Sequence, residues 1–194
     1  MTQSKGARSR GGQSKGGALR VMRSLRSVRR FAEREIPDNV LDSILEVGRW
    51  TGSAKNTQPW KVVVVAERET LGALSKLGQF AGHIAGAKVA LVLVMDGANN
   101  AFDCGRLAER LMVAAWAHGV GSCIGSLFPD ENSTSAKRLL GIPEDKWVRQ
   151  VISLGYPADE TAHRISTTPN TRGALPSIGR KPTRDFASRE RYDA

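Results

Sequence analysis

The 194-residue sequence predicts one domain of the α+β or α/β class, with helices surrounding a small sheet. Apolar, partly β-branched runs at 60–65 (WKVVVV), 88–95 and 147–154 are typical of strands, and we expect the first two to be buried on both faces. Segments with helical periodicity separate these runs. A composition of 40% hydrophobic and 25% charged residues is ordinary for a globular protein and argues against wholesale disorder.

Five helices are expected around these strands. Leu19, Met22 and Leu25 recur at a spacing of three and predict a short, arginine-rich helix within residues 18–31. Pro37 suits the first turn of a second helix, because its missing N–H would have no partner there in any case. Further helices are predicted around residues 67–79, 102–118 and 133–140.

The remaining segments are predicted to be loops or tails. Residues 51–59 are small and polar, and the Gly/Ser-rich stretch 119–126 interrupts the helical periodicity, so both are expected to be loops. Residues 1–17 predict a flexible basic tail in front of a domain spanning 18–160. The polar segment 161–194 has little core-forming pattern and predicts an extended arm that wraps a partner subunit.

The formal net charge of +10 is unevenly distributed. Residues 1–30 contain nine basic side chains and no acidic one, whereas residues 31–194 contain 20 basic and 19 acidic groups. The body is therefore nearly neutral, and nucleic acid is not expected to bind to it. One alternative function is a binding module whose basic arm contacts nucleic acid nonspecifically, because the arm lacks interleaved aromatic residues.

Several other classes of protein find no support in the sequence. The longest apolar run, Val89 to Met95, is far shorter than the ~20 residues of a membrane span, so no membrane partner is expected. Two cysteines form neither a metal cluster nor a disulfide framework, and a reducing cytoplasm is the expected location. The three histidines lack metal-ligand spacing, so no metal site is predicted.

Three segments could bind a ligand. The first, RSVRRF at 26–31, offers arginines and a serine suited to phosphate, although a solvated helix end has the same composition. The second, the loop from Ser53 to Gln58, offers polar groups for the edge of a planar heterocycle. The third, at 119–126, contains glycines that allow close backbone approach to a ligand or simply end a helix.

Taken together and in order, these segments resemble the nitroreductase family of FMN-dependent oxidoreductases. The matching pieces lie within about residues 20–186: RSVRRF, SAKNTQPWKVVVV, HGVGSCIGS, LGIPED and VISLGYPAD. The resemblance implies a three-layer α+β fold in which helices flank a small, mainly antiparallel sheet. It also implies an intertwined homodimer with FMN at the subunit interface and long termini embracing the partner.

The resemblance also implies which residues contact the phosphate of FMN. Arg26 and Ser27 would hold it, and Arg180, in a late GRKP stretch, would be a second phosphate contact. Arg29 would lie toward the ribityl chain and the N1–C2 edge of the flavin, where its charge could stabilise the reduced form. A phosphate contact or a plain surface position for Arg29 is an equal alternative.

The isoalloxazine ring would be contacted from two directions. By the resemblance, Ser53 and Asn56 reach it from the opposite subunit, and a backbone N–H of the third segment points toward flavin N5. Gln79 and His83 are secondary candidates, and Cys123 is expected to be a small buried thiol. The residues lining the ring would be Ile124, Gly125 and Ser126.

The implied activity is an NAD(P)H-dependent, ping-pong reduction of nitroaromatic, quinone or related planar acceptors. FMN would supply the chemistry, and no acidic or nucleophilic side chain is assigned as catalytic. Either NADH or NADPH could be the donor. The alternatives within the family are a specialised dehalogenase, a dehydrogenase or a flavin-consuming enzyme.

Overall fold

The computed structural model describes residues 13–159 and 182–192. The chain divides into two units, residues 1–163 and 164–194, and each is described by itself. In the second unit, the described residues contain the short helix α6 (Thr183–Phe186). Most of the predicted tail and arm lies outside the described residues, so those two boundaries stay predictions.

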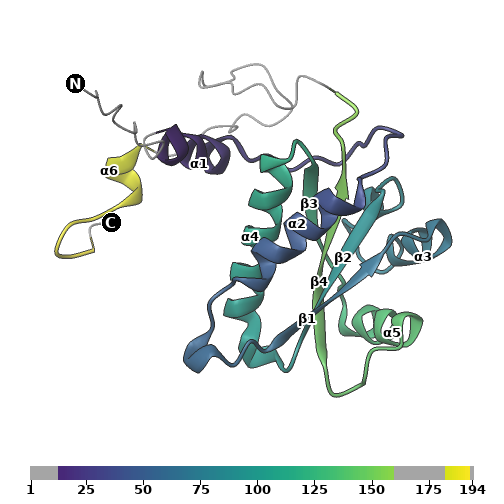
Figure 1. Ribbon diagram of the computed structural model, residues 1–194. Coiled ribbons are helices and arrows are strands. Elements are labelled where there is room, and N and C mark those ends of the chain that lie inside the picture. The colour runs from purple at the N-terminus through teal and green to yellow at the C-terminus, as the bar shows by residue number, and fades with distance from the viewer. Residues whose placement is uncertain (1–12, 160–181, 193–194) are drawn as a thin grey trace, which may run out of the picture. The chain divides into compact units, whose positions relative to one another are not determined.

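The centre of the first unit is a four-stranded antiparallel sheet (Figure 1). Its strand order is β1-β2-β4-β3, so β2 and β4 are central and β1 and β3 are the two edges. This confirms the predicted α+β class with an antiparallel sheet. The strands are β1 (Trp60–Val65), β2 (Val89–Met95), β3 (Gly121–Ser126) and β4 (Trp147–Gly155).

Helices cover both faces of this sheet and complete three layers (Figure 1). The side chains of β2 alternate between the faces, as a strand requires. Leu91 and Leu93 pack with α2 and α4, whereas Ala90 and Val92 belong to the cluster with α3 and α5. The helices of this unit are α1 (Gln13–Ser24), α2 (Asp38–Arg49), α3 (Arg68–Leu74), α4 (Ala101–Ala117) and α5 (Asp130–Leu140).

The expectation that β1 would be buried on both faces was wrong. β1 pairs only with β2 among the described strands, and its other edge is open. Lys61 is exposed and Val64 keeps 41% of its surface accessible. A run of valines reports strand propensity but does not distinguish a central strand from an edge strand. The same expectation is confirmed for β2, whose seven residues are all buried.

The Gly/Ser-rich stretch expected to be a loop contains β3, the edge strand opposite β1. Glycine disfavours strands on propensity alone, so the sequence pattern concealed this element. The structure shows why small residues occur here. A Cβ built on Gly121 would lie 2.7 Å from the Cβ of Val28, too close for any side chain.

The first helix also differs from the prediction. α1 begins at Gln13 and ends at Ser24, whereas a helix within residues 18–31 was expected. It stops there because the following residues are extended, and the Val28 N–H donates to the Ser122 carbonyl at 2.8 Å. The arginines that follow are thereby displayed from an extended segment instead of a helix face.

Close packing of α2 on α4 depends on a glycine in the last turn of α2. A Cβ on Gly48 would lie 2.5 Å from Leu111 Cδ2 and 3.5 Å from Leu107 Cδ1. Both leucines are buried in the core, so they have little room to move.

We expect Gly48→Ala to lower the free energy of unfolding by about 1–2 kcal/mol, because overpacking outweighs the gain in helix propensity. Gly72→Ala is the control, since Gly72 lies in α3 and nothing is within 4 Å of the place that its Cβ would take. That variant should be unchanged or more stable by up to about 1 kcal/mol. Denaturant unfolding of both full-length variants compares the two, and equal midpoints would contradict the packing argument.

Candidate functional site

The segment after α1 is fastened along the end of the sheet that contains the start of β3. The Val28 N–H donates to Ser122, and Lys88, at the start of β2, forms ion pairs with Glu33 at 2.7 Å and Glu35 at 2.9 Å. The Lys88 side chain is only 9% exposed, so these carboxylates cover it. Two more backbone bonds hold the segment, from Ala32 N to Tyr156 O and from Ala158 N to Arg30 O. Arg29 lies between these anchors and is exposed.

At Ile124 the outer edge of β3 has no backbone partner among the described residues, whereas at Ser126 the backbone of Gly78 packs closely against the carbonyl oxygen. Backbone groups of an edge strand point alternately toward its neighbour and outward. Because the Ser122 carbonyl points outward to Val28, the N–H groups of Ile124 and Ser126 also point outward. No backbone bond from Ile124 N to another described residue occupies this direction. The Ile124 side chain is 40% exposed, so the edge is reachable from solvent.

Arg29 sets the electrostatics of this edge. Burial, reinforced by the positive charge of Arg29, lowers the pKa of His83 from its usual 6.5, so the imidazole is neutral at pH 7. Burial raises the pKa of the Cys123 thiol, and Arg29 and a hydrogen bond from Ser27 oppose that rise. Arg29 therefore acts on groups of both β3 and the segment before β2. We call the outward groups of β3 and the residues Arg26–Arg29 the β3-edge site.

Two other predicted residues of this site already have intramolecular partners. The Arg26 guanidinium donates through Nη1 to the carbonyls of Leu25 at 2.8 Å and Arg23 at 3.2 Å, at the end of α1. Ser126 Oγ accepts a hydrogen bond from Arg149 Nε at 3.3 Å. A guanidinium has five N–H donors, so Arg26 keeps donors for a ligand.

The loop between α2 and β1 holds the other predicted contacts. Ser53 Oγ accepts a hydrogen bond from the Gln58 backbone N–H at 2.8 Å, so this hydroxyl shapes the loop. Lys55, Asn56 and Gln58 all have positive φ, between 49° and 55°. Non-glycine residues rarely adopt this conformation, and several of them together define an unusual, specifically shaped loop. Asn56 is exposed on it.

The structure does not bring this loop together with the β3-edge site. The loop leads into Trp60, which pairs with Met95 at the far end of β2. Ser27 bridges to Ser122 of β3, and Ser122 pairs with Leu154 of β4. Leu154 in turn pairs with Val89, at the opposite end of β2. The length of β2 alone separates these ends by about 20 Å, at ~3.3 Å per residue. Ser53 and Asn56 therefore belong to a different corner of the chain from Arg26, Ser27 and Arg29.

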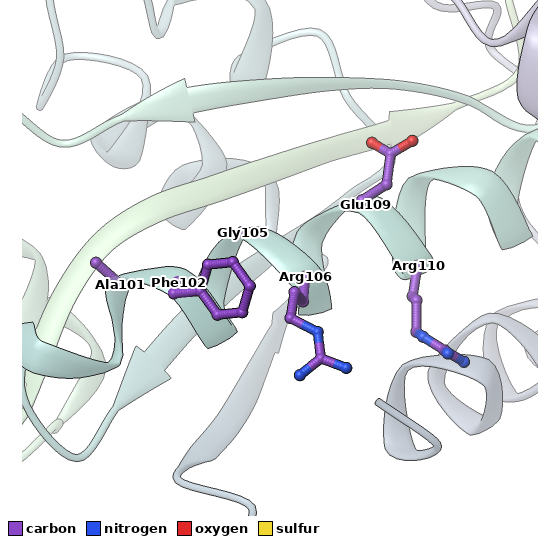
Figure 2. Close-up of a pocket in the computed structure, with 6 residues that line it drawn as sticks. All are labelled: Ala101, Phe102, Gly105, Arg106, Glu109 and Arg110. Carbon is purple, nitrogen blue, oxygen red and sulfur yellow. The ribbon is translucent and has the colours of Figure 1, made fainter. Parts of the chain in front are cut away.

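A shallow groove of about 610 Å³ lies on the exposed side of α4 near this loop. Figure 2 shows the Phe102, Arg106 and Arg110 side chains projecting from the helix into it. Phe102 is 78% exposed, and a Cβ on Gly52 would lie 3.0 Å from Arg106 Nη2, so the loop abuts the groove. Since one helix alone lines the groove, it is an open surface instead of an enclosed ligand pocket.

The other predicted flavin contacts stay predictions. Arg180 lies outside the described residues. Gln79 is exposed, but His83 lies under β3, with its Nε2 3.4 Å from the position of a Cβ on Gly125. Within the described ranges, no group of three or more His, Cys, Asp or Glu side chains could hold a metal ion. In the same residues, no helix has both the length and the apolar character needed to cross a bilayer.

Ser153, a fully buried serine of β4, forms a hydrogen bond with His83 that no local sequence pattern predicts. A serine within the apolar run WVRQVISL was the one available sign of this contact. A polar side chain at the centre of a buried strand needs a partner, and the sequence does not reveal which one.

Known proteins with this fold identify the family. The Nitroreductase family pattern matches residues 22–91 and 83–156, and the chain belongs to the nitroreductase family. An Archaeoglobus fulgidus protein is 35% identical over 150 residues, covering 73% of this chain and 86% of that protein. It has the provisional name NADH dehydrogenase/NAD(P)H nitroreductase.

Solved structures agree with this assignment. An FMN-dependent nitroreductase from Clostridium difficile is 25% identical, with a TM-score of 0.68 over 73% of this chain and 88% of that one. The NADPH:FMN oxidoreductase of Vibrio harveyi, complexed with NAD⁺, has a TM-score of 0.73 at 21% identity. The match covers 92% of this chain and 79% of that one, and at that identity it supports the fold alone.

We expect Gly121→Ala to detach the Arg26–Arg29 segment from β3, because the new methyl group would collide with Val28. Amide hydrogen exchange at Val28 should accelerate roughly tenfold or more, since its bond to Ser122 would be broken. Gly86→Ala is the control, because nothing lies within 4 Å of its Cβ position. Unchanged protection of Val28 in the Gly121 variant would show that the close contact does not fix this segment.

Proposed function

We propose that this protein is an FMN-dependent oxidoreductase that takes a hydride from NAD(P)H and reduces planar acceptors such as nitroaromatics or quinones. Family membership supports this, as does the similarity to the C. difficile protein named as FMN-dependent and the A. fulgidus protein named for NAD(P)H. The observation that best supports it is the outward Ile124 N–H, which has no backbone partner among the described residues and lies on a strand whose Cys123 side chain feels the charge of Arg29.

The residues present at the β3-edge site fit FMN. A flavin has ring atoms that accept hydrogen bonds, a ring that becomes anionic when reduced, and a phosphate. The open edge offers backbone donors to the ring, and Arg29 offers a positive charge. Ser27 and the free donors of Arg26 would hold the phosphate, with Arg180 as the second phosphate contact. Gly121 and Gly125 have no side chains, which leaves room for Val28 beside the first and His83 beside the second.

Side-chain chemistry is not required for this reaction, because FMN held at this site would supply the redox chemistry. The thiols of the chain are poor nucleophiles. Burial raises the pKa of Cys104 to about 11 and also raises that of Cys123, so both are protonated at pH 7. The task of the protein is to orient the ring and to stabilise its reduced form, and Arg29 is the cation available for the second role.

We further propose that each complete site is formed by two copies of this chain. One copy would supply the β3-edge site, and the other would supply Ser53 and Asn56, since a single chain holds these groups at opposite ends of its sheet. The exposed α4 groove beside that loop offers an apolar and basic surface for a second copy. The open edge of β1 offers backbone groups with which the C-terminal arm of the partner could pair.

The test of cofactor and donor begins with the purified full-length protein, which should be yellow or should take up added FMN. Anaerobic mixing with NADH or NADPH in a stopped-flow instrument should bleach the flavin absorbance. Arg29→Ala should weaken FMN binding roughly tenfold, the cost of one charge-assisted hydrogen bond, while the neighbouring control Arg30→Ala should change it little. A protein that binds no FMN, or whose flavin neither nucleotide reduces, would refute this function.

The shared site can be tested by mixing two variants that each bind FMN weakly. Arg29→Ala damages one half-site and Asn56→Ala damages the other, so each homodimer should bind FMN poorly. Random heterodimers would combine both intact halves in one of their two sites, restoring about a quarter of all sites in a symmetric dimer. FMN titration of the co-refolded mixture measures this recovery, and its absence would refute a site shared between two copies.

A further inference from the structure

A chain of hydrogen bonds runs beneath β3, on the face opposite α2 and α4. His83 Nδ1 lies 2.7 Å from Ser153 Oγ, and Ser153 Oγ donates to the Cys123 carbonyl at 3.2 Å. The three residues come from separate elements: the short helix η2 (Gly82–Ile84), β4 and β3. Ser153 is fully buried, so water does not compete for these bonds.

Both contacts are hydrogen bonds at once in only one arrangement of protons. The single hydroxyl proton of Ser153 goes to the Cys123 carbonyl, which can only accept, and the imidazole donates from Nδ1 to Ser153 Oγ. This arrangement requires the His83 tautomer that is protonated on Nδ1. Nε2 is then left with its lone pair, and this atom is buried without a hydrogen-bond partner among the described residues.

The series of hydrogen bonds ends at the peptide group between Cys123 and Ile124. The Cys123 carbonyl and the Ile124 N–H belong to the same planar trans peptide and point in opposite directions. The carbonyl points toward β4, whereas the N–H points out from the open edge of β3. Donation into a carbonyl polarises its peptide, and the N–H on the other side becomes a stronger donor.

We propose that His83 and Ser153 are positioning residues that strengthen the Ile124 N–H as a donor and thereby raise the electron affinity of the flavin at the β3-edge site. This inference rests on the function proposed above. A donor dipole directed at the ring favours its electron-rich, reduced form. Arg29 favours the same form by its charge, and it is the charged group that acts on both His83 and Cys123.

The first test uses the protein without added flavin. Nitrogen-15 NMR of His83 should show protonation at Nδ1 and a bare Nε2, and Ser153→Ala should abolish this fixed tautomer. In the same variant the Ile124 amide proton should move upfield, as expected for a weaker donor. Protonation at Nε2 in the wild type, or an unmoved Ile124 resonance in the variant, would overturn the inference whether or not FMN binds.

The second test uses the flavin-loaded protein. Ser153→Ala and His83→Phe should each lower the affinity for reduced relative to oxidised FMN, by roughly twofold to fivefold. For a two-electron couple this corresponds to a midpoint potential more negative by about 10–20 mV. The double variant should shift no further than either single variant, because the two residues act in one chain.

A matched control separates this effect from simple loss of a buried serine. Ser122 is a buried serine of β3 whose hydroxyl has no partner among the described residues, so Ser122→Ala should leave the potential unchanged. A shift in this control as large as that of Ser153→Ala, or additive shifts in the double variant, would overturn the proposal. Failure of the wild type to bind FMN would instead refute the proposed function and leave the NMR test decisive.

Discussion

The structure depends on how the outer edge of β3 is used. An edge strand presents backbone donors and acceptors that must find partners or remain open to water. Here Val28 takes up the first outward carbonyl, and the next outward N–H, that of Ile124, has no backbone partner among the described residues. The contact requires Gly121 to lack a side chain, and it ends α1 early enough to display Arg29. One short backbone contact therefore sets both the position of the arginines and the length of edge left for a ligand.

Much of the fold was predictable because apolar runs and helical spacing report burial directly. β2 and β4 were found within a residue of their bounds, and α4 within one residue at each end. β3 was missed because its role demands small residues, which remove the side-chain pattern that marks a strand. The exposed face of β1 was also missed, since valines are chosen for strand propensity at edges and centres alike.

The candidate site was predictable only where its residues are adjacent in sequence. The segment Arg26–Arg29 and the strand around Ile124 could each be recognised as units, and the structure places them side by side. The distance from Ser53 and Asn56 to that site depends on which end of the sheet each loop occupies, which no local pattern specifies. The bond between His83 and Ser153 joins residues 70 positions apart, and its tautomer follows only from the proton count at Ser153.

The wide separation of the two groups of contacts has a consequence for how such an enzyme responds to its own concentration. If each site requires loops from two copies, a dissociated chain has no complete site. Catalytic capacity would then follow the monomer–dimer equilibrium, and dilution would remove activity. Raising the concentration of the chain above the dissociation constant of the dimer would be sufficient to produce activity.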